Sequence, residues 1–290
     1  MLSAASIKLH MQSFLLANDL PLSRIGYGTM RLIADGAWGP PLDPTAAKAI
    51  LHRALDLGVN LIDTADAYGP QELERFIGET LAPYPAGVVI ATKAGLARMA
   101  PAKSEPLGRP SYLRQQVEMS LRYLKLEQLP LWQLHRIDPQ VPLEDSLGMI
   151  RDLQQAGKIR HVGLSEVNVA QIEQARRILP IVSVQNKYNL TERKHEAVLD
   201  YCTQNNIAFL PWYPVAAGKL NAPGSKLAAI ATRLGATPTQ LQLSWLLHRS
   251  PVIVPIPGTS SLAHLEENCA ALNLTLTPQD LQEIESAVAP

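Results

Sequence analysis

Apolar and polar residues alternate along this chain on two length scales. Short apolar runs rich in Val, Ile and Leu have the length of buried strands, and the stretches between them repeat apolar residues with the period of a helix. The runs that predict strands cover residues 24–30, 59–64, 87–92, 129–135, 159–165, 180–186, 207–213 and 251–257. The stretches that predict helices cover residues 44–58, 71–82, 110–125, 143–157, 169–178, 193–205, 225–248 and 261–272.

Eight strand–helix units in a chain of 290 residues predict an α/β fold, a parallel (β/α)₈ or TIM barrel, with an N-terminal β-hairpin. The competing architecture, a doubly wound sheet, usually carries a G-x-G-x-x-G turn after its first strand, and this sequence has none there. No linker separates the units, so residues 13–290 are expected to form one barrel domain. Residues 1–12 show no clear period and predict a loosely ordered N-terminal extension.

Composition argues against several kinds of partner. The 26 basic and 26 acidic side chains cancel without a run of like charge, which argues against binding to nucleic acid or to an anionic membrane. No window approaches the roughly 18 apolar residues of a membrane span. Cys202 and Cys269 lie far apart without a C-x-x-C, so we expect neither a disulfide framework nor a zinc site. The expected location is the cytoplasm.

Three ionisable residues, Asp63, Lys93 and His135, end three consecutive predicted strands. In a (β/α)₈ barrel the carboxyl ends of the strands form the active site, and Tyr68, five residues after Asp63, can fold over the same mouth. A carboxylate and an ammonium group there are expected to pair, because each alone is costly to bury. The cation is expected to lower the pKa of Tyr68, which would then donate a proton near neutral pH. His135 offers a second hydrogen-bond donor to a developing oxyanion.

Other interpretations of these residues stay open. Asp63 alone can cap the turn that follows it, and Tyr68 before Gly69 and Pro70 is typical of a turn. A metal-dependent (β/α)₈ hydrolase or isomerase would need several ligands at the strand ends. His135 is the only histidine at a predicted strand end, so no metal site is predicted.

The motifs around these residues resemble those of the aldo-keto reductases, and the segments "GAWGPPLD" and "PIPGTSSLAHLEEN" are similar to the bacterial pyridoxal-reducing subgroup of that family. The segment "IDTADAYG" is similar to the family's Asp-x-x-x-x-Tyr signature, "IATKAG" to its lysine strand and "LWQLHRID" to its histidine strand, and the likeness runs from Ile25 to the C-terminus. It implies that Tyr68 is the general acid of carbonyl reduction and that Lys93 lowers its pKa. It also implies that Asp63 holds Lys93 and that His135 orients the carbonyl. A monomer is the family expectation.

The resemblance implies a reduced nicotinamide cofactor, bound in extended form across the barrel mouth. "GLSEVN" is similar to a Gly-x-Ser-Asn segment, so Ser165 would bond the carboxamide, and the second contact falls to Glu166 or to Asn168. Gln185 would be the other carboxamide partner, and Trp212 would stack on the ring, with Tyr213 as the substitute. The implied residues at this end are Gly28, Thr29, Met30, Asp63, Ser165, Gln185, Trp212 and Tyr213.

The segment "PIPGTSSLAHLEEN" is similar to the family's adenosine-phosphate segment, and the start of its helix favours a phosphate. Gly258 replaces the common lysine, and His264 stands where an arginine is common. The implied contacts toward this end are Pro214, Gly218, Ile256, Gly258, Thr259, Ser260, His264, Glu267 and Asn268. NADP(H) is the favoured cofactor, and NAD(H) stays open because two cations are missing.

The substrate is expected to be a small carbonyl compound. The predicted pocket residues are Trp38, Tyr68 and His135. Pyridoxal is the specific candidate from the subgroup likeness, beside other small aromatic or aliphatic aldehydes. A barrel that holds NADP(H) as a redox sensor without turnover is the alternative from another class.

Two segments bear on the shape of the pocket. Residues 94–111 predict a long polar loop that walls one side, in which Arg98, Lys103 and Arg109 suit either an anionic substrate or solvent. Residues 273–290 predict one more helix, which leaves little chain for a lid. The pocket is therefore expected to be open.

Overall fold

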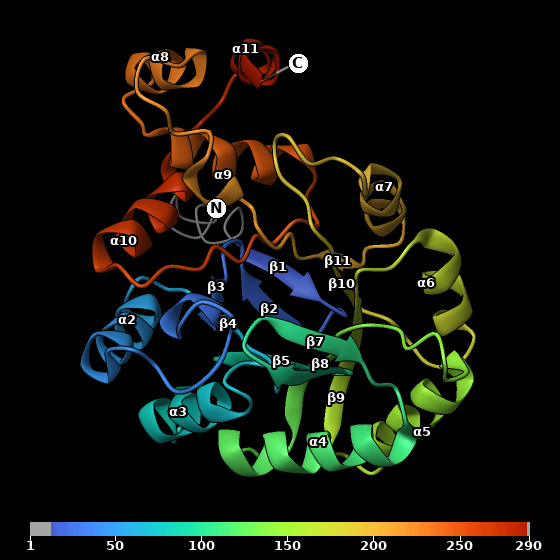
Figure 1. Cartoon of the computed structure of the whole chain (residues 1–290). Helices are drawn as coiled ribbons and strands as arrows, with labels where there is room; N and C mark the ends of the chain where they lie inside the picture. Colours follow the sequence, from blue (N-terminus) through green and yellow to red (C-terminus); the bar gives the residue numbers. More distant parts are fainter. Residues whose placement is uncertain (1–12, 289–290) are drawn as a thin grey trace, which may run out of the picture.

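The computed structural model describes residues 13–288 of the chain, so the extension predicted for residues 1–12 lies outside the described residues. Strands occupy the middle of the molecule and helices surround them (Figure 1). Strand and helix alternate along the chain as predicted, so the (β/α)₈ barrel with its N-terminal hairpin is confirmed.

Seven parallel strands form the central sheet, in the order β11-β10-β9-β8-β5-β4-β3. Strands that follow one another in the chain are thus neighbours in the sheet, with a short antiparallel hairpin inserted between β5 and β8. The strands are β3 (Tyr27–Gly28), β4 (Leu61–Asp63), β5 (Val89–Ala94), β8 (Leu129–Leu134), β9 (Ile159–Ser165), β10 (Ser183–Gln185) and β11 (Ala208–Phe209).

The predicted eighth strand, residues 251–257, closes the barrel without forming a regular strand. On one side Phe209 N donates to Val252 O at 2.8 Å, and on the other Gly26 N donates to Pro255 O at 2.9 Å. The segment contains three prolines, which have no N–H to donate to a sheet ladder. The apolar run therefore predicted that this segment is extended and closes the barrel. The prolines explain why it forms few backbone hydrogen bonds with its neighbours.

The helices lie close to their predicted positions. The predicted stretch 225–248 is divided into two helices, because Thr237 caps a new helix that begins at Pro238. The C-terminal stretch forms a further helix, as predicted. The helices are α2 (Pro44–Asp56), α3 (Glu72–Leu81), α4 (Pro110–Leu124), α5 (Leu143–Gln155), α6 (Val169–Arg176), α7 (Glu196–Gln204), α8 (Lys226–Arg233), α9 (Pro238–Arg249), α10 (Leu262–Ala270) and α11 (Pro278–Val288).

Two antiparallel hairpins lie at opposite ends of the barrel. β1 (Ser13–Leu16) pairs with β2 (Leu20–Ser23), and Ser23 exchanges hydrogen bonds with Asn60, which immediately precedes β4. This hairpin therefore lies at the amino end of the strands. β6 (Leu96–Ala100) pairs with β7 (Lys103–Pro106) directly after β5, at the carboxyl end. The polar loop predicted for residues 94–111 is thus partly a hairpin.

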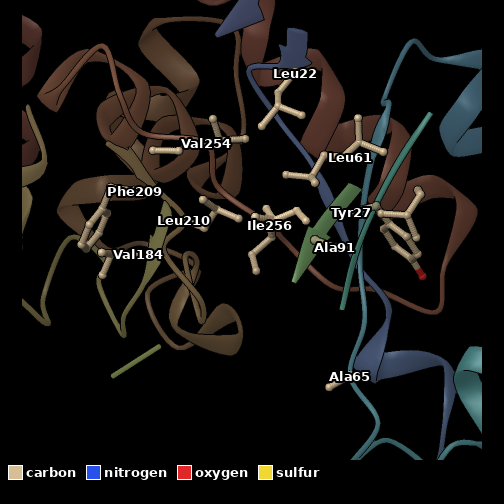
Figure 2. Close-up of a cluster of buried hydrophobic side chains, with 14 of the residues drawn as sticks. Leu22, Tyr27, Leu61, Ala65, Ala91, Val184, Phe209, Leu210, Val254 and Ile256 are labelled. Atoms are coloured by element: carbon tan, nitrogen blue, oxygen red, sulfur yellow. The ribbon is translucent and has the colours of Figure 1, made fainter. Parts of the chain in front are cut away.

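The core joins side chains from all around the barrel. Figure 2 shows Leu22 of β2, Leu61 of β4 and Val184 of β10 in the same buried cluster as Val254 and Ile256 of the closing segment. Burying apolar surface of this kind is the main favourable term in folding. Among residues 13–288, no helix is long and apolar enough to cross a membrane.

A glycine sets the distance between two neighbouring helices. A Cβ added at Gly78 in α3 would lie 2.0 Å from the carbonyl oxygen of Tyr123 near the end of α4, whereas a Cβ at Gly148 in α5 would meet nothing within 4 Å. We predict that Gly78→Ala lowers the free energy of unfolding by about 2 kcal/mol or more, because backbone must move to relieve the overlap. Urea denaturation measures the change.

Gly148→Ala is the matched control, since it puts the same methyl group on a helix without a clash. It is expected to leave stability unchanged or to raise it by up to about 1 kcal/mol. Equal effects of the two substitutions would contradict the close helix approach.

Candidate active site

A cavity of about 350 Å³ opens at the carboxyl ends of the strands. Tyr68 and His135 line it, and so does Asp63 at the end of β4. Lys93, near the end of β5, lies behind this wall as the partner of Asp63. The four residues predicted from the strand ends are thus brought together.

Lys93 and Asp63 form a buried ion pair. Lys93 Nζ donates to Asp63 Oδ2 and to the carbonyl oxygen of Thr64, each at 2.7 Å, and neither side chain of the pair is more than 3% exposed. Burial is the largest single effect and lowers the pKa of Lys93, but the charges of Asp63 and Tyr68 and the hydrogen bond to Asp63 together outweigh it, and the net pKa is raised. The amine therefore stays charged beside the cavity.

The second oxygen of Asp63 is held by a chain of buried amides. Gln185 Nε2 donates to Asp63 Oδ1 at 2.9 Å and to Gln133 Oε1 at 3.0 Å. Gln133 Nε2 in turn donates to Ser183 Oγ at 3.0 Å. These bonds satisfy a carboxylate that would otherwise be costly in the barrel interior.

Tyr68 is placed by the backbone that continues beyond β4. Asp66 N donates to Lys93 O at 3.0 Å, which keeps the turn beside β5, and Tyr68 N donates to Ala65 O at 3.1 Å. Gly69 follows at φ 108°, a conformation that favours glycine. Lys93 Nζ lies 5.5 Å from the centroid of the Tyr68 ring.

The pKa of Tyr68 is raised, and the expectation of a lowered value was wrong. Burial is the largest effect and raises the pKa of Tyr68, and the charge of Asp63 acts in the same direction. Lys93, Arg136 and Arg98 lower the pKa without reversing the shift. The phenol therefore keeps its proton at neutral pH, and the cations favour the phenolate that proton donation would leave.

His135 is a neutral imidazole beside Tyr68. Its backbone N–H donates to Ala94 O at 2.8 Å, and its ring centroid lies 6.3 Å from that of Tyr68. Burial lowers the pKa of His135 well below its ordinary value, and Lys93, Arg136 and Arg98 lower it further. Nδ1 is buried and has no hydrogen-bond partner within residues 13–288, so the ring proton is better placed on Nε2, the other nitrogen.

Two further acids are buried near Lys93. Burial raises the pKa of Asp66, with a contribution from Glu74, and raises the pKa of Glu74 to about 7. Tyr112 donates to Asp66 and Thr92 donates to Glu74, while one oxygen of each acid has no partner in the described part of the chain. Asp66 therefore favours its neutral form, Glu74 exchanges its proton near neutral pH, and Asp63 is the carboxylate that pairs with Lys93.

A second cavity of about 500 Å³ adjoins the first and shares four lining residues with it: Arg31, Val215, Ala217 and Gly258. Together they form an elongated site with amide, hydroxyl and aromatic groups at one end and the hydroxyls of Thr259 and Ser260 at the other. This donor set suits an extended dinucleotide. The residues predicted for the cofactor all line one cavity or both: Gly28, Thr29, Met30, Asp63, Ser165, Gln185, Trp212, Tyr213, Pro214, Ile256, Gly218, Gly258, Thr259, Ser260, His264, Glu267 and Asn268.

Neither candidate for the second carboxamide contact lines the cavities. Asn168 caps α6, accepting from Gln171 N at 2.9 Å. Glu166, at φ 55°, accepts from the indole Nε1 of Trp212 and from Lys187 N, both at 2.7 Å. Glu166 thus anchors Trp212, and the sequence offered no signal for this contact between residues far apart in the chain.

Glycine at position 258 has a steric reason. A Cβ at Gly258 would lie 2.8 Å from Gly28 O, so the backbones of the closing segment and β3 leave no room for a side chain. The same Cβ would lie 3.4 Å from Arg31 Cγ, so Arg31 occupies the space beside this glycine. The guanidinium of Arg31 supplies a positive charge there.

Several lining residues were not predicted, and one predicted residue lies elsewhere. Trp38 is 41% exposed and does not line either cavity; a backbone bridge to Gly69 holds its loop beside the Tyr68 turn. The unpredicted lining residues come from hairpin β6–β7, from turns and from α9: Arg31, Leu96, Ser104, Arg136, Val215, Ala217, Asn221 and Thr239. Arg98, noted as a candidate for an anionic substrate, also lines the first cavity.

Metal ligands are not grouped in the described part of the chain. No cluster of three or more His, Cys, Asp or Glu residues that could hold a metal ion occurs within residues 13–288.

An acid, a lysine, a tyrosine and a histidine at the mouth of a barrel define an oxidoreductase of the aldo-keto reductase class, and the comparisons agree. The model of the aldo/keto reductase family matches residues 24–289. An uncharacterised oxidoreductase of Schizosaccharomyces pombe is 49% identical over 92% of this chain and 87% of its own length. Pyridoxine 4-dehydrogenase of Escherichia coli is 42% identical, covering 91% and 94%.

Among solved structures, an aldo-keto reductase of Klebsiella pneumoniae in complex with NADPH superimposes with a TM-score of 0.80 at 25% identity, covering 95% of this chain and 94% of that one. The chain therefore belongs to the aldo/keto reductase family, whose members are NAD(P)H-dependent oxidoreductases.

The buried Glu74 predicts a stability that depends on pH. Its pKa rises from 4.5 in the unfolded chain to about 7 in the folded protein, so between these values folding takes up a proton and stability falls as pH rises. At about 1.4 kcal/mol per pKa unit, the wild type should lose on the order of 3 kcal/mol through this group between pH 4.5 and pH 8. Urea denaturation at a series of pH values measures the loss.

Glu74→Gln keeps an oxygen for Thr92 and has no charge to bury, so its stability should fall less over this pH range. Glu79→Gln, on the exposed side of the same helix, is the control and should keep the wild-type dependence. Parallel curves for wild type and Glu74→Gln would contradict the assignment.

Proposed function

We propose that this protein reduces aldehydes or ketones to alcohols with NADPH, and that Tyr68 is the general acid. The observation that carries the proposal is the placement of a protonated phenol and a neutral imidazole on one wall of a cavity, backed by the buried pair of Lys93 and Asp63. The bound cofactor would supply the hydride to the carbonyl carbon.

The four residues divide the work at the carbonyl oxygen. Tyr68 holds a proton, since burial raises its pKa, and donates it to the oxygen as negative charge develops there. Lys93 then stabilises the phenolate, and Asp63 fixes Lys93 in place. His135, neutral and protonated on Nε2, donates a hydrogen bond that orients the carbonyl.

The cofactor residues follow the shape of the two cavities. At the nicotinamide end we propose the Ser165 hydroxyl and the Gln185 amide for the carboxamide, with Trp212 against the ring. Gln185 already uses Nε2 toward Asp63, so its oxygen is the atom that would accept from the carboxamide NH₂. At the other end, we propose that the hydroxyl groups of Thr259 and Ser260 donate hydrogen bonds to phosphate oxygens of the cofactor.

Arg31 is the proposed cation for the cofactor phosphates. It lines both cavities at their junction, where the pyrophosphate of an extended dinucleotide would lie. Its side chain fills the space beside Gly258, where the family commonly has a lysine. The pyrophosphate is common to NADH and NADPH, so this contact would serve either cofactor, and the preference for NADP(H) is supported by the similar aldo-keto reductase solved with NADPH.

Pyridoxal is the proposed specific substrate among small aldehydes, supported by the 42% identity with pyridoxine 4-dehydrogenase. The non-catalytic redox sensor is the less favoured alternative, because all four residues of the proton-donating group are present and assembled.

The cytoplasm, a monomeric state and a single barrel domain over residues 13–290 stay predictions from the sequence. The two cysteines are unpaired, as is usual in a reducing compartment.

Tyr68→Phe tests the general acid. Removing the hydroxyl should lower kcat for aldehyde reduction at least a hundredfold while leaving the affinity for NADPH within about twofold. NADPH consumption with a panel of aldehydes that includes pyridoxal measures the first quantity, and quenching of tryptophan fluorescence measures the second. Turnover by Tyr68→Phe at the wild-type rate would rule out the role. Tight NADPH binding without turnover of any panel member by the wild type would favour the sensor.

Arg31→Gln tests the phosphate contact. We expect the dissociation constant of NADPH to rise about tenfold, because a hydrogen bond to a charged phosphate is lost. The matched control is Arg75→Gln on the exposed face of α3, which should leave NADPH binding unchanged. Fluorescence titration gives both constants, and NADH titrated in parallel should bind the wild type more weakly than NADPH. An unchanged constant for Arg31→Gln would overturn the phosphate contact, and tighter binding of NADH than of NADPH would overturn the choice of NADP(H).

A further inference from the structure

The charges around Tyr68 and His135 are positive on balance. The side chains that line the first cavity include three arginines and one carboxylate, Asp63, which Lys93 already neutralises. His135 is neutral because burial lowers its pKa. Of these arginines, Arg31 pairs with Asp35 at 3.6 Å and the charge of Glu166 acts on Arg136, whereas Arg98 has no ion-pair partner among residues 13–288.

Arg98 comes from hairpin β6–β7, which covers the cavity from the side. Its Nε donates to Ala67 O at 3.4 Å, next to Tyr68, and this is the one hydrogen bond that its guanidinium makes within residues 13–288. No carboxylate lies within salt-bridge distance of Arg98 in that part of the chain. The two Nη groups thus have their donors available to a ligand.

Arg136 follows His135 directly in the sequence and lines the same cavity as Arg98. Its Nη1 donates to His135 O at 2.5 Å and to Ser165 Oγ at 3.1 Å, which fixes the guanidinium against the cavity wall. Both arginines act on the reacting centre, since each lowers the pKa of Tyr68 and of His135. Their charges therefore reach the place where a carbonyl would sit.

Arg98 and Arg136 are separate from the phosphate end of the site. They line the first cavity only, whereas Arg31 lines both. The cofactor phosphates thus have their own cation at the junction, and the two arginines beside Tyr68 remain for another anion.

We propose that the site reduces a carbonyl compound that carries a carboxylate or phosphate group in preference to an uncharged aldehyde such as pyridoxal, and that Arg98, assisted by Arg136, binds this anion while Tyr68 faces the carbonyl. This inference rests on the proposed function and names its substrate class. Guanidinium groups bind both kinds of oxyanion through paired N–H donors, so the shared chemistry is the oxyanion.

The first experiment compares substrates that differ only in charge. With NADPH as the reductant, 4-formylbenzoate should be reduced with a catalytic efficiency at least tenfold higher than its methyl ester, and the excess should shrink at high salt. The pair of 4-oxobutanoate and its methyl ester repeats the test on an aliphatic chain. Comparing the catalytic efficiency for pyridoxal 5′-phosphate with that for pyridoxal tests whether a phosphate group gives the same advantage as a carboxylate.

The variants assign the preference to one residue. Arg98→Gln should remove most of the advantage of the anion by weakening its apparent affinity, with a much smaller effect on the ester, and Arg98→Lys should restore part of it. Arg109→Gln is the control, because Arg109 is exposed in the same segment and lines neither cavity. Its charge preference should match that of the wild type.

A binding measurement keeps the test independent of turnover. Calorimetric titration of 4-methylbenzoate, which has no carbinol to oxidise, into the protein with NADP⁺ should give a dissociation constant that rises about tenfold in Arg98→Gln. Wild type that reduces the ester and the acid equally well would overturn this inference and leave the proposed function standing. Wild type that reduces neither would overturn the proposed function, and the titration would then decide on the anion site. A rise in the NADPH constant of Arg98→Gln equal to its effect on the anion would reassign Arg98 to the cofactor and overturn the inference.

Discussion

The buried ion pair between Lys93 and Asp63 is the constraint on which the rest of the site depends. Taking two charges into a barrel interior costs several kcal/mol for each ion unless their remaining hydrogen-bonding capacity is used. Here the carbonyl oxygen of Thr64 accepts a second hydrogen bond from the ammonium group of Lys93, and Gln185 donates to the second carboxylate oxygen of Asp63. Removing one partner would leave the other charge buried without a counter-ion. The amides behind the pair therefore stabilise the catalytic arrangement as well as the barrel core.

Strand pairing determines where the side chains of the site lie. β4, β5 and β8 are neighbours in the sheet, and their ladders continue past the strand ends. Thr64 N donates to Ala91 O and Asp66 N to Lys93 O, while His135 N donates to Ala94 O. Groups from well-separated parts of the sequence are thus held by backbone bonds at the same edge. Rigid placement of this kind reduces the reorganisation needed when charge develops on a bound carbonyl.

The fold and the position of the site were predictable from the sequence, because the hydrophobic periodicity indicates the strands and the carboxyl ends of parallel strands meet at one end of a barrel. Asp63, Lys93 and His135 were found in this way. The pKa of Tyr68 was not, because the sequence shows the neighbouring cation but not the burial that outweighs it. The anchoring of Trp212 by Glu166 joins residues 46 positions apart through a left-handed backbone, and no local pattern announces such a contact.

Glu166 also bears on the charge of the site. A carboxylate pointing into the cavity would compete with an anionic ligand for Arg136, which lies on the neighbouring strand end. Its Oε1 is instead occupied by the indole of Trp212 and the backbone of Lys187, and Glu166 is absent from the cavity walls. The same contact therefore fixes an aromatic wall and holds the Glu166 carboxylate outside the cavity, from where its charge still acts on Arg136. Since Asp63 is neutralised by Lys93, the field that a ligand meets beside Tyr68 is set by arginines.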